Sequence, residues 1–452
     1  MKKSLLSFVV LSLQLSTLAA GNTFNVRDYG AKGDGIVLDT AAINQAIAAC
    51  AKGGGGEVLL PAGRYRSGTI HLCSRLAFHL GAGAELIGST NLDDYQQPAI
   101  PASLPEAKLG KWHRALIVGE NLEDASIIGP GTINGNKVFD PTGEEDQRGP
   151  HTIHFVNCRR LMMRDFDIVD SANLAIFFQA SDDVEVRNVE ITGGWDGVHF
   201  WGWPGHWCHN VRIIGCNFFT GDDSIAGRYW DNVVVSRCLI NTSCNGVRLF
   251  GPAVHLLVSD CLFYGPGSRP HRTSGRTNML CGIILQPGAW DSTSGPLDDV
   301  LLANNTMREV ASPVTVWSRP DNPAGRITIS GLNATGVYRS ALSAESWAGE
   351  PITNVVLRNA QIEFTGGGTA EQAQEKVIHP EVDCRSLPCW GIYLRNVERF
   401  TCQDVRLSLA RDDFRPVVLA EGVPHLDLDN LRYQSVTGVN KPIKTNELLI
   451  QK

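Results

Sequence analysis

A short pattern of alternating apolar residues recurs from about residue 122 onward, and this repeat limits the possible folds more than any other feature. Alternation with a period of two indicates strands, and a spacing of 22 to 28 residues between copies, except where loops intervene as between His255 and Asp299, indicates a solenoid. The copies lack the Leu/Asn signature of leucine-rich repeats and are rich in β-branched residues. Successive copies begin at Asn210, Asn232 and His255, and later ones near Asp299, Arg326, Asn354, Arg399 and His425. We therefore predict an all-β, single-domain right-handed parallel β-helix.

The first part of the mature chain differs from these repeats and predicts a cap for the end of the stack. Asp39 precedes an apolar 3.6-residue pattern over Thr40 to Ala51, which indicates a helix with Asp39 as its N-cap. The glycines from 53 to 56 end this helix before a predicted strand over Glu57 to Leu60. An N-terminal capping helix would shield the open edge that repeat folds must cover.

The N-terminus has the pattern of an export signal. Lys2 and Lys3 supply positive charge, and a mostly apolar run extends from Leu5 to Leu18, followed by small residues around Ala20. The run is too short to span a membrane. We predict a signal peptide over residues 1–20, a β-helix domain over residues 21–445, and a periplasmic or secreted location.

Charge and cysteine usage exclude several classes of protein. The formal net charge of −7 leaves no basic footprint for nucleic acid. The 12 cysteines are too few for a disulfide scaffold at this length, although Cys384 and Cys389 enclose a short loop and predict one bridge. Cys216, Cys238 and Cys261 occupy matched positions in successive repeats and predict a column of buried thiols. No metal site is predicted, since no CxxC pair or histidine cluster accompanies them.

A second periodicity places carboxylates in register. Asp196 and Asp223 each lie 13 residues after the start of their own repeat, and Asn173 and Asn245 hold the same place in the flanking repeats. If the repeats stack as coils about 4.8 Å apart, these residues form a column on one face, with Asp222 beside Asp223. Crowding raises the pKa of at least one carboxyl, which can then serve as an acid beside an ionised partner. Glycoside hydrolysis needs such a pair.

Two other interpretations of this column remain open. Asn and Asp ladders also cap the turns of β-solenoids, and the same carboxylates could bind calcium.

Alternation along the strands predicts which neighbours of the column leave the core. Five apolar side chains should point inward: Val198, Phe200, Ile225, Val247 and Leu249. His199 and Arg248 should then point outward toward solvent, with Arg228 a further candidate, and an outward Arg can bind a uronate carboxylate through two hydrogen bonds. Trp201 belongs to a group of tryptophans after Asp196 whose rings could stack on sugars. The insertion from Pro266 to Leu280 should border this face and could close one end of a cleft.

At these residues the chain resembles glycoside hydrolase family 28, the polygalacturonases and rhamnogalacturonases. The opening Phe24-Asn-Val-Arg-Asp-Tyr-Gly-Ala-Lys-Gly-Asp-Gly is shared by several β-helix families. Asp196-Gly197 and Gly221-Asp222-Asp223 match more specific motifs of the family. The resemblance implies that Asp222 is the general acid and that Asp196 and Asp223 activate water in an inverting hydrolysis. It implies no cofactor, and an α-linked pectic polysaccharide or oligosaccharide as substrate.

The chain also departs from the polygalacturonases at two motifs. Cys244-Asn245-Gly246 stands where they carry Gly-His-Gly, and Gly282-Ile-Ile-Leu-Gln286 lacks the two basic residues of their Arg-Ile-Lys. The stretch Asp196-Gly-Val-His-Phe-Trp-Gly202 instead resembles the rhamnogalacturonases. We therefore expect an atypical member, in which Asn173, His199, Trp201, Arg228, Asn245 and Arg248 contact the saccharide.

Three alternatives concern the chemistry itself. Carboxylates on adjacent coils would lie about 5 Å apart, a spacing that is typical of retaining rather than inverting enzymes. A polysaccharide lyase could share the scaffold, but it would need a base, for which the column offers Arg248 and no Lys. A non-catalytic saccharide-binding β-helix is the third possibility.

Overall fold

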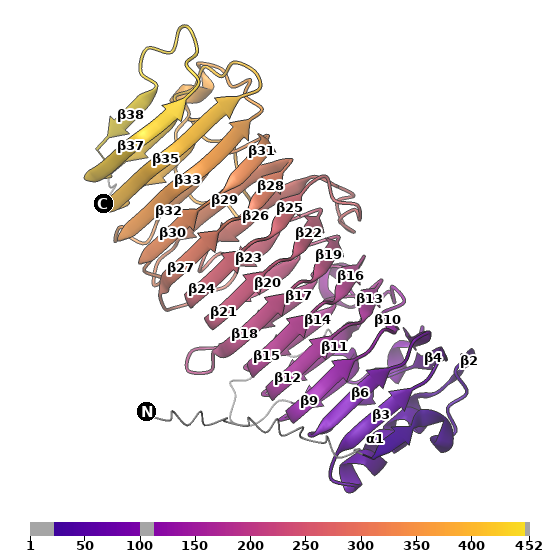
Figure 1. Cartoon of the computed structure of the whole chain (residues 1–452). Helices are drawn as coiled ribbons and strands as arrows, with labels where there is room; N and C mark the ends of the chain where they lie inside the picture. Colours follow the sequence, from indigo (N-terminus) through magenta and orange to yellow (C-terminus); the bar gives the residue numbers. More distant parts are fainter. Residues whose placement is uncertain (1–21, 100–112, 448–452) are drawn as a thin grey trace, which may run out of the picture.

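The computed structural model describes residues 22–99 and 113–447, and it shows one long stack of parallel strands (Figure 1). Strands of each coil pair in parallel with their counterparts one coil later, so that the coils form three faces. This confirms the predicted single-domain parallel β-helix. The predicted signal peptide lies outside the described residues, and the domain boundaries remain predictions.

Face 1 is a 13-stranded sheet within the described residues. Its strands are β5 (Ile70–His71), β8 (Ala115–Glu120), β11 (His151–Val156), β14 (Ile176–Gln179), β17 (Val198–Trp201), β20 (Ile225–Arg228), β23 (Val247–Leu249), β26 (Met279–Leu285), β29 (Val310–Ser318), β32 (Leu342–Ser346), β34 (Ile392–Arg395), β36 (Val418–Glu421) and β38 (Ile443–Asn446).

Face 2 carries the apolar repeats from which the fold was predicted. Its strands are β1 (Thr23–Asn25), β3 (Gly56–Leu60), β6 (Leu76–Leu80), β9 (Glu123–Ile128), β12 (Arg159–Arg164), β15 (Asp182–Arg187), β18 (Cys208–Ile214), β21 (Trp230–Ser236), β24 (Ala253–Ser259), β27 (Leu297–Ala303), β30 (Arg326–Ser330), β33 (Asn354–Phe364), β35 (Arg399–Leu409) and β37 (His425–Tyr433).

Face 3 consists of shorter strands that follow those of face 2 in each coil. They are β2 (Asp34–Leu38), β4 (Gly63–Ser67), β7 (Ala84–Gly88), β10 (Thr132–Asn134), β13 (Asp167–Val169), β16 (Glu190–Thr192), β19 (Asn217–Thr220), β22 (Leu239–Thr242), β25 (Leu262–Tyr264), β28 (Thr306–Arg308) and β31 (Asn333–Val337). The long strand β33 continues face 3 after β31.

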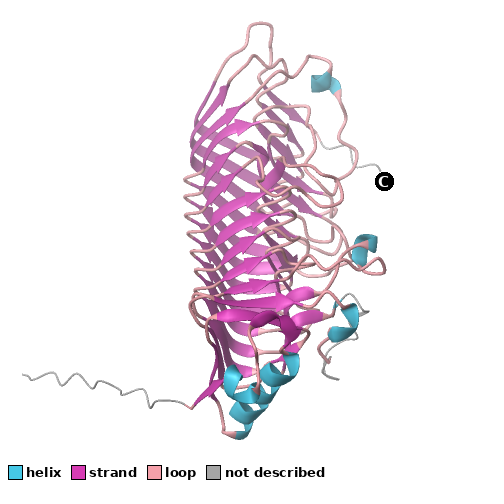
Figure 2. Cartoon of the chain, turned by 90° about the vertical axis from the view of Figure 1, so that its right-hand side faces the viewer, coloured by secondary structure: helices cyan, strands magenta, loops and turns pink. Residues whose placement is uncertain are grey.

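Helix α1 (Thr40–Lys52) covers the N-terminal end of the stack (Figures 1 and 2). Ile43 and Ile47 are buried in the main core, as the helical pattern predicts. The side chain of Asp39 does not cap the helix, contrary to prediction. Its two carboxylate oxygens instead accept hydrogen bonds from the N–H groups of Lys32 (2.7 Å) and Gly33 (3.0 Å), because the turn before the helix folds back onto it.

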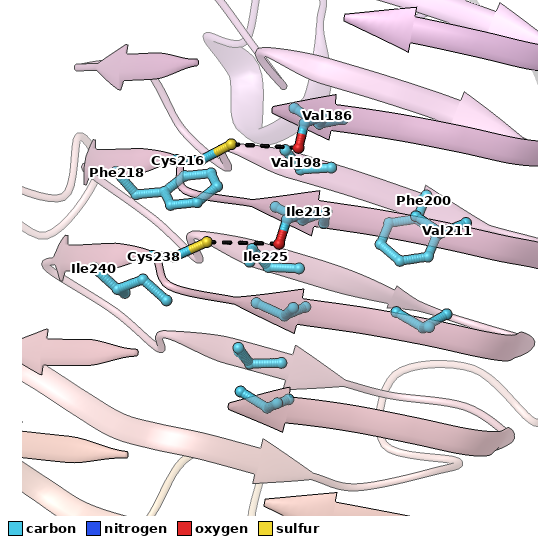
Figure 3. Close-up of a cluster of buried hydrophobic side chains, with 14 of the residues drawn as sticks. Val186, Val198, Phe200, Val211, Ile213, Cys216, Phe218, Ile225, Cys238 and Ile240 are labelled. Atoms are coloured by element: carbon cyan, nitrogen blue, oxygen red, sulfur yellow. Dashed lines mark hydrogen bonds between the residues drawn. The ribbon is translucent and has the colours of Figure 1, made fainter. Parts of the chain in front are cut away.

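The interior is a continuous apolar column, part of which Figure 3 shows. All five residues predicted to point inward are fully buried in it: Val198, Phe200, Ile225, Val247 and Leu249. The predicted thiol column is also present. Cys216 and Cys238 donate to the carbonyl oxygens of Val186 (3.5 Å) and Ile213 (3.7 Å), and the Sγ of Cys261 accepts from the N–H of Cys238 (3.5 Å).

The predicted bridge between Cys384 and Cys389 is absent, because both thiols are free. The two residues are buried in different places. Cys384 packs in a small cluster with Cys244, Leu280 and Ala311, whereas Cys389 packs with Leu387 and Tyr393. The short loop between them therefore turns the side chains toward separate clusters.

Three long connections, residues 135–150, 265–278 and 365–391, all run from face 3 to face 1. The remaining turns are short along one edge of the stack, and the longer loops gather along another (Figure 2). Among the described residues, we find no helix with the length and apolar character needed to cross a membrane.

Candidate active site

The predicted carboxylate column lies in the turn that leads from face 3 into face 1. Val198 of β17 pairs with Ile225 of β20, which in turn pairs with Val247 of β23. Backbone hydrogen bonds continue this register into the turn. The N–H of Gly197 donates to the carbonyl of Asp223 (3.0 Å), and that of Ser224 to the carbonyl of Asn245 (3.0 Å). Asp196, Asp223 and Asn245 therefore lie on adjacent coils.

Asn173 departs from this column by one residue. The carbonyl of Asp196 accepts from the N–H of Ala175 (3.0 Å), so Leu174 holds the place that the repeat spacing gave to Asn173. The turn before β14 contains one extra residue, which spacing measured from face 2 cannot reveal. Asn173 is fully buried, and its amide has no hydrogen-bond partner among the described residues.

Asp222 is surrounded by cationic and donor groups from two long connections. Its Oδ2 lies 3.2 Å from Nη2 of Arg148 and 3.7 Å from Nε2 of His271, and its Oδ1 accepts from the N–H of Asp223 (3.1 Å). Burial alone would raise the pKa of Asp222, but His271 and the charge of Arg148 outweigh burial and lower that pKa. Asp222 is therefore ionised in the free protein.

Asp196 has the opposite electrostatic character. Burial raises its pKa well above the ordinary value, and the charges of Asp222 and Asp223 raise it further. Its Oδ2 lies 2.7 Å from Nδ1 of His199, whose pKa burial lowers to about 4. The raised pKa favours the protonated form of Asp196, and because the imidazole of His199 is neutral, the two groups share a hydrogen bond rather than an ion pair.

Asp223 is held from the next coil. Its Oδ1 accepts from the backbone N–H (3.0 Å) and the side-chain amide (2.9 Å) of Asn245, and its Oδ2 lies 3.4 Å from Nη1 of Arg248. The amide oxygen of Asn245 accepts from the N–H of Cys281 (3.1 Å). Asn245 therefore orients Asp223, and both the nitrogen and the oxygen of its side-chain amide are hydrogen-bonded.

His199 and Arg248 leave the core as predicted, but neither faces open solvent. Their exposed fractions are 9% and 5%, because ring side chains cover His199 and residues 382–383 cover Arg248. Nη2 of Arg248 donates to the carbonyl of Val382 (2.9 Å) and lies 3.4 Å from Asp383. Strand alternation predicts direction from the core, whereas burial depends on loops packed from elsewhere.

Arg228 and Trp201 are neighbours on paired strands, and the guanidinium lies 4.7 Å from the centre of the Trp201 ring. Arg228 also forms an ion pair with Asp291 from the connection after β26. The adjacent Trp290 is exposed, and its ring centre lies 5.1 Å from the guanidinium of Arg248. Of the two predicted arginines, Arg248 pairs with Asp223 of the cluster, whereas Arg228 contacts an aromatic ring beside it.

Arg148 was missed by sequence reasoning, because nothing in residues 135–150 marks them as part of the site. The connection crosses two coils to place Arg148 over the Trp195 ring, 3.9 Å from its centre. Arg148 is also paired with Glu145 at 2.6 Å.

His271 and Arg276, in the predicted border loop, were missed as well. The loop does border the site, as expected. Nη2 of Arg276 lies 2.9 Å from the sulfur of Cys244, whose pKa is raised by burial and by Asp223 and Asp222.

An aromatic wall on face 1 adjoins Asp196. His154 stacks on Phe177 with ring centres 4.4 Å apart, and the Phe177 ring meets those of Trp201 and His199 edge to face. Burial and the neighbouring His113 lower the pKa of His154 to about 3, so this imidazole is neutral. His154 and Phe177 are fully buried and His199 is nearly so, so among these four rings the partly exposed ring of Trp201 is the one that offers surface to a sugar.

The same cluster includes a possible set of metal ligands. Ligand atoms of Asp222, Asp223 and Cys244 lie within 4.8 Å of one another. Each of the three already faces a guanidinium, from Arg148, Arg248 and Arg276 respectively. The local negative charge is thus compensated by the protein's own cations, and a thiol is a poor ligand for calcium.

Comparison with known proteins finds relatives among the polygalacturonases. Residues 23–91 match the family model described as rhamnogalacturonase A/epimerase, pectate lyase-like. The chain is 28% identical over 263 residues to an exo-poly-α-D-galacturonosidase of Dickeya chrysanthemi, covering 46% of this chain and 42% of that protein. It is 22% identical to an exopolygalacturonase of Platanus acerifolia, covering 82% of this chain and 98% of the relative. The resemblance to glycoside hydrolase family 28 is confirmed.

A solved structure extends this similarity to the whole fold. The exopolygalacturonase of Thermotoga maritima superposes with a TM-score of 0.64 at 17% identity, covering 85% of this chain and 91% of that one. At this identity the match establishes the β-helix alone. The alignment with the Dickeya protein spans less than half of that relative's length, so activity and substrate are argued below from the site.

The opposite pKa shifts of Asp196 and Asp222 predict opposite pH dependence of folding stability. A raised pKa makes Asp196 cost stability as pH rises above about 4, the unfolded value. Asp196→Asn keeps a hydrogen-bonding side chain beside His199, so it should become progressively more stabilising as pH rises above about 4. A lowered pKa makes Asp222 contribute stability that is lost as pH falls, so Asp222→Asn should destabilise most near neutrality.

Urea unfolding of both variants and the wild type across this pH range measures these effects. The two changes are isosteric, so each is the control for the other. Parallel pH profiles for the two variants would contradict the assigned protonation states.

Proposed function

We propose that this protein is a glycoside hydrolase that cleaves α-glycosidic bonds in pectic, uronate-containing saccharides. The observation that carries the proposal is the division among three adjacent carboxyls, of which Asp196 and Asp223 are buried and Asp222 is partly buried. Burial and the neighbouring carboxylates favour the protonated form of Asp196, whereas Arg148 and His271 favour the ionised form of Asp222. Environments that push carboxyl pKa values apart are the usual basis of paired acid and base catalysis.

In the proposed reaction Asp222 protonates the leaving oxygen, and Asp196 with Asp223 activates water for inversion. In the free protein the pKa shifts favour the opposite states, so Asp222 must acquire a proton and Asp196 must release one before the bond breaks. Arg148 offers the means, because a substrate carboxylate that pairs with this guanidinium would draw it away from Asp222. Loss of the neighbouring cation raises the pKa of Asp222 toward the value that an acid requires.

The preference for a uronate rests on the cations around the cluster. Arg148, Arg228 and Arg248 reach the carboxylates or the adjacent rings from three different parts of the chain. A guanidinium binds a planar carboxylate through two parallel hydrogen bonds, which gives affinity and orientation together. The tryptophan rings beside them supply surface for the apolar faces of the sugar.

We further propose that cleavage occurs at chain ends. Residues 381–385 lie across face 1 on the C-terminal side of the cluster. They are held by hydrogen bonds from Arg248 to Val382 (2.9 Å) and from Arg319 to Glu381 (2.7 Å), and Arg385 pairs with Glu345 at 2.6 Å. On the other side the 135–150 connection covers Asp222. A polymer could not pass straight through such a site.

A polysaccharide lyase is less well supported, because the guanidinium of Arg248 is engaged by Asp223, Val382 and Asp383 and is not placed as a free base. Export to the periplasm or beyond is proposed on the predicted signal peptide alone.

An aryl α-galacturonide with a good leaving group distinguishes the role of the general acid from that of the carboxylates that activate water. Asp222→Asn should reduce turnover of a pectic oligosaccharide by about 10²–10⁴-fold, because the leaving oxygen is no longer protonated. Turnover of the aryl substrate needs no acid and should fall by only about tenfold or less. Steady-state kinetics on both substrates measures the difference.

Asp196→Asn and Asp223→Asn are the matched controls, and each should lose activity on both substrates. Selective retention of aryl-substrate turnover by Asp196→Asn would instead make Asp196 the acid.

The products released early from a long galacturonan test action at chain ends. If the segment 381–385 closes the cleft, the first products should be one short saccharide of fixed length, while the viscosity of the polymer falls slowly. Chromatography of the products beside viscometry measures both. An early ladder of intermediate lengths would rule out the closed cleft.

A further inference from the structure

His271 has a fixed position, because its connection is fastened on both sides of the carboxylate column. Nη2 of Arg272 donates to the carbonyl of Ser171 (3.1 Å), and Nε of Arg276 donates to that of Ser243 (3.0 Å). Within the loop, the N–H of His271 donates to the carbonyl of Arg276 (2.9 Å), and that of Gly275 donates to the carbonyl of His271 (2.8 Å). The imidazole is buried, with 8% of the residue exposed.

The contacts of the ring define its tautomer. Nδ1 lies 3.3 Å from the backbone nitrogen of Ser274, 3.1 Å from the hydroxyl of that residue and 3.0 Å from the hydroxyl of Thr273. A backbone N–H can only donate, so Nδ1 must accept. Both hydroxyls can also turn their protons toward it. The proton of the neutral imidazole is therefore on Nε2.

Nε2 is the ring atom that faces the catalytic cluster. It lies 3.7 Å from Oδ2 of Asp222, and the ring meets Trp195 edge to face at 5.9 Å. This distance is longer than an ordinary hydrogen bond, as is common in unliganded active sites. The N–H dipole nonetheless lies close to the carboxylate oxygen that also contacts Arg148.

We propose that His271 is a positioning residue for Asp222, acting as an Nε2–H donor that orients this carboxyl and favours its ionised form. Arg148 supplies a charge that a bound uronate can remove, whereas His271 supplies a dipole that stays in place throughout. Asp222 is thus held in one orientation while its protonation changes. The catalytic consequence rests on the proposed function, but the tautomer and the contact do not.

Several other groups influence the same carboxyl. They are Arg148 from the 135–150 connection, Asp196, Asp223 and Cys244 from the neighbouring turns, Arg248 from β23, and Arg276 from the same loop as His271. None of them is changed by a substitution at position 271, so the effect of that substitution reports on the imidazole.

The first test needs no substrate. ¹⁵N NMR of the histidine rings in the intact protein should show His271 with its proton on Nε2, and the signal is assigned by its loss in His271→Gln. In urea unfolding near neutral pH, His271→Ala should lower the midpoint strongly when Asp222 is present and less in the Asp222→Asn background. His271→Gln should behave like the wild type, because its amide can donate from nearly the same place as Nε2.

The second test uses turnover. If Asp222 is the acid, loss of the donor raises its pKa in the bound complex. The alkaline limb of the kcat profile should then move up by roughly one pH unit in His271→Ala and stay in place in His271→Gln. His255→Gln, at an exposed histidine on face 2, is the matched control and should change neither measurement.

A proton on Nδ1, or equal destabilisation by His271→Ala in both backgrounds, would overturn the proposal. If the protein hydrolyses no pectic substrate while the tautomer and the coupling are as expected, the proposed function fails and the role of His271 toward Asp222 stands. If His271→Ala does not fold, the ¹⁵N spectrum of the wild type and the behaviour of His271→Gln still test whether Nε2 of His271 donates to Asp222.

Discussion

Parallel pairing from coil to coil is the constraint on which the rest of the site depends. Backbone hydrogen bonds continue from the strands into the turn that carries Asp196 and Asp223. The two carboxyls therefore cannot move apart to relieve their repulsion, and burial denies them water. Under these conditions one group must keep a proton and the others must find cations. Both outcomes occur here, at Asp196 and at Asp222 with Asp223.

The groups that compensate the charge of the carboxylates come from the long connections between coils, whose length and sequence are not fixed by the strand pairing. Arg148 and His271 arrive in two long connections, one from three coils before Asp222 and one from two coils after it. A third connection brings Asp383 to Arg248. The coils thus place the carboxylates, while the loops tune their ionisation and close the surface around them. An open face of a β-helix becomes a confined site by these insertions.

The sequence predicted the features that repeat and missed those that do not. Period-two alternation and the spacing of Asp196 and Asp223 follow directly from stacking, so the fold and the column could be inferred. One extra residue before β14 was enough to displace Asn173 from the column.

The contacts made by the loops do not follow the repeat, so periodicity cannot predict them. Nothing in the sequence around Arg148 distinguishes it from an arginine on the surface. The same holds for the burial of His199 and Arg248, which distant segments cover. The predicted N-cap role of Asp39 was wrong because its carboxylate accepts hydrogen bonds from the preceding turn instead of from the helix.

The central claim is that the three carboxyls hydrolyse a pectic chain, and the products of the purified protein test it most directly. Incubation of the wild type and Asp222→Asn with a panel of pectic polysaccharides and oligosaccharides should give saturated reducing ends from the wild type alone. Unsaturated, ultraviolet-absorbing ends would instead mean a lyase. Saturated products in equal amounts from both proteins would contradict the assignment of the site.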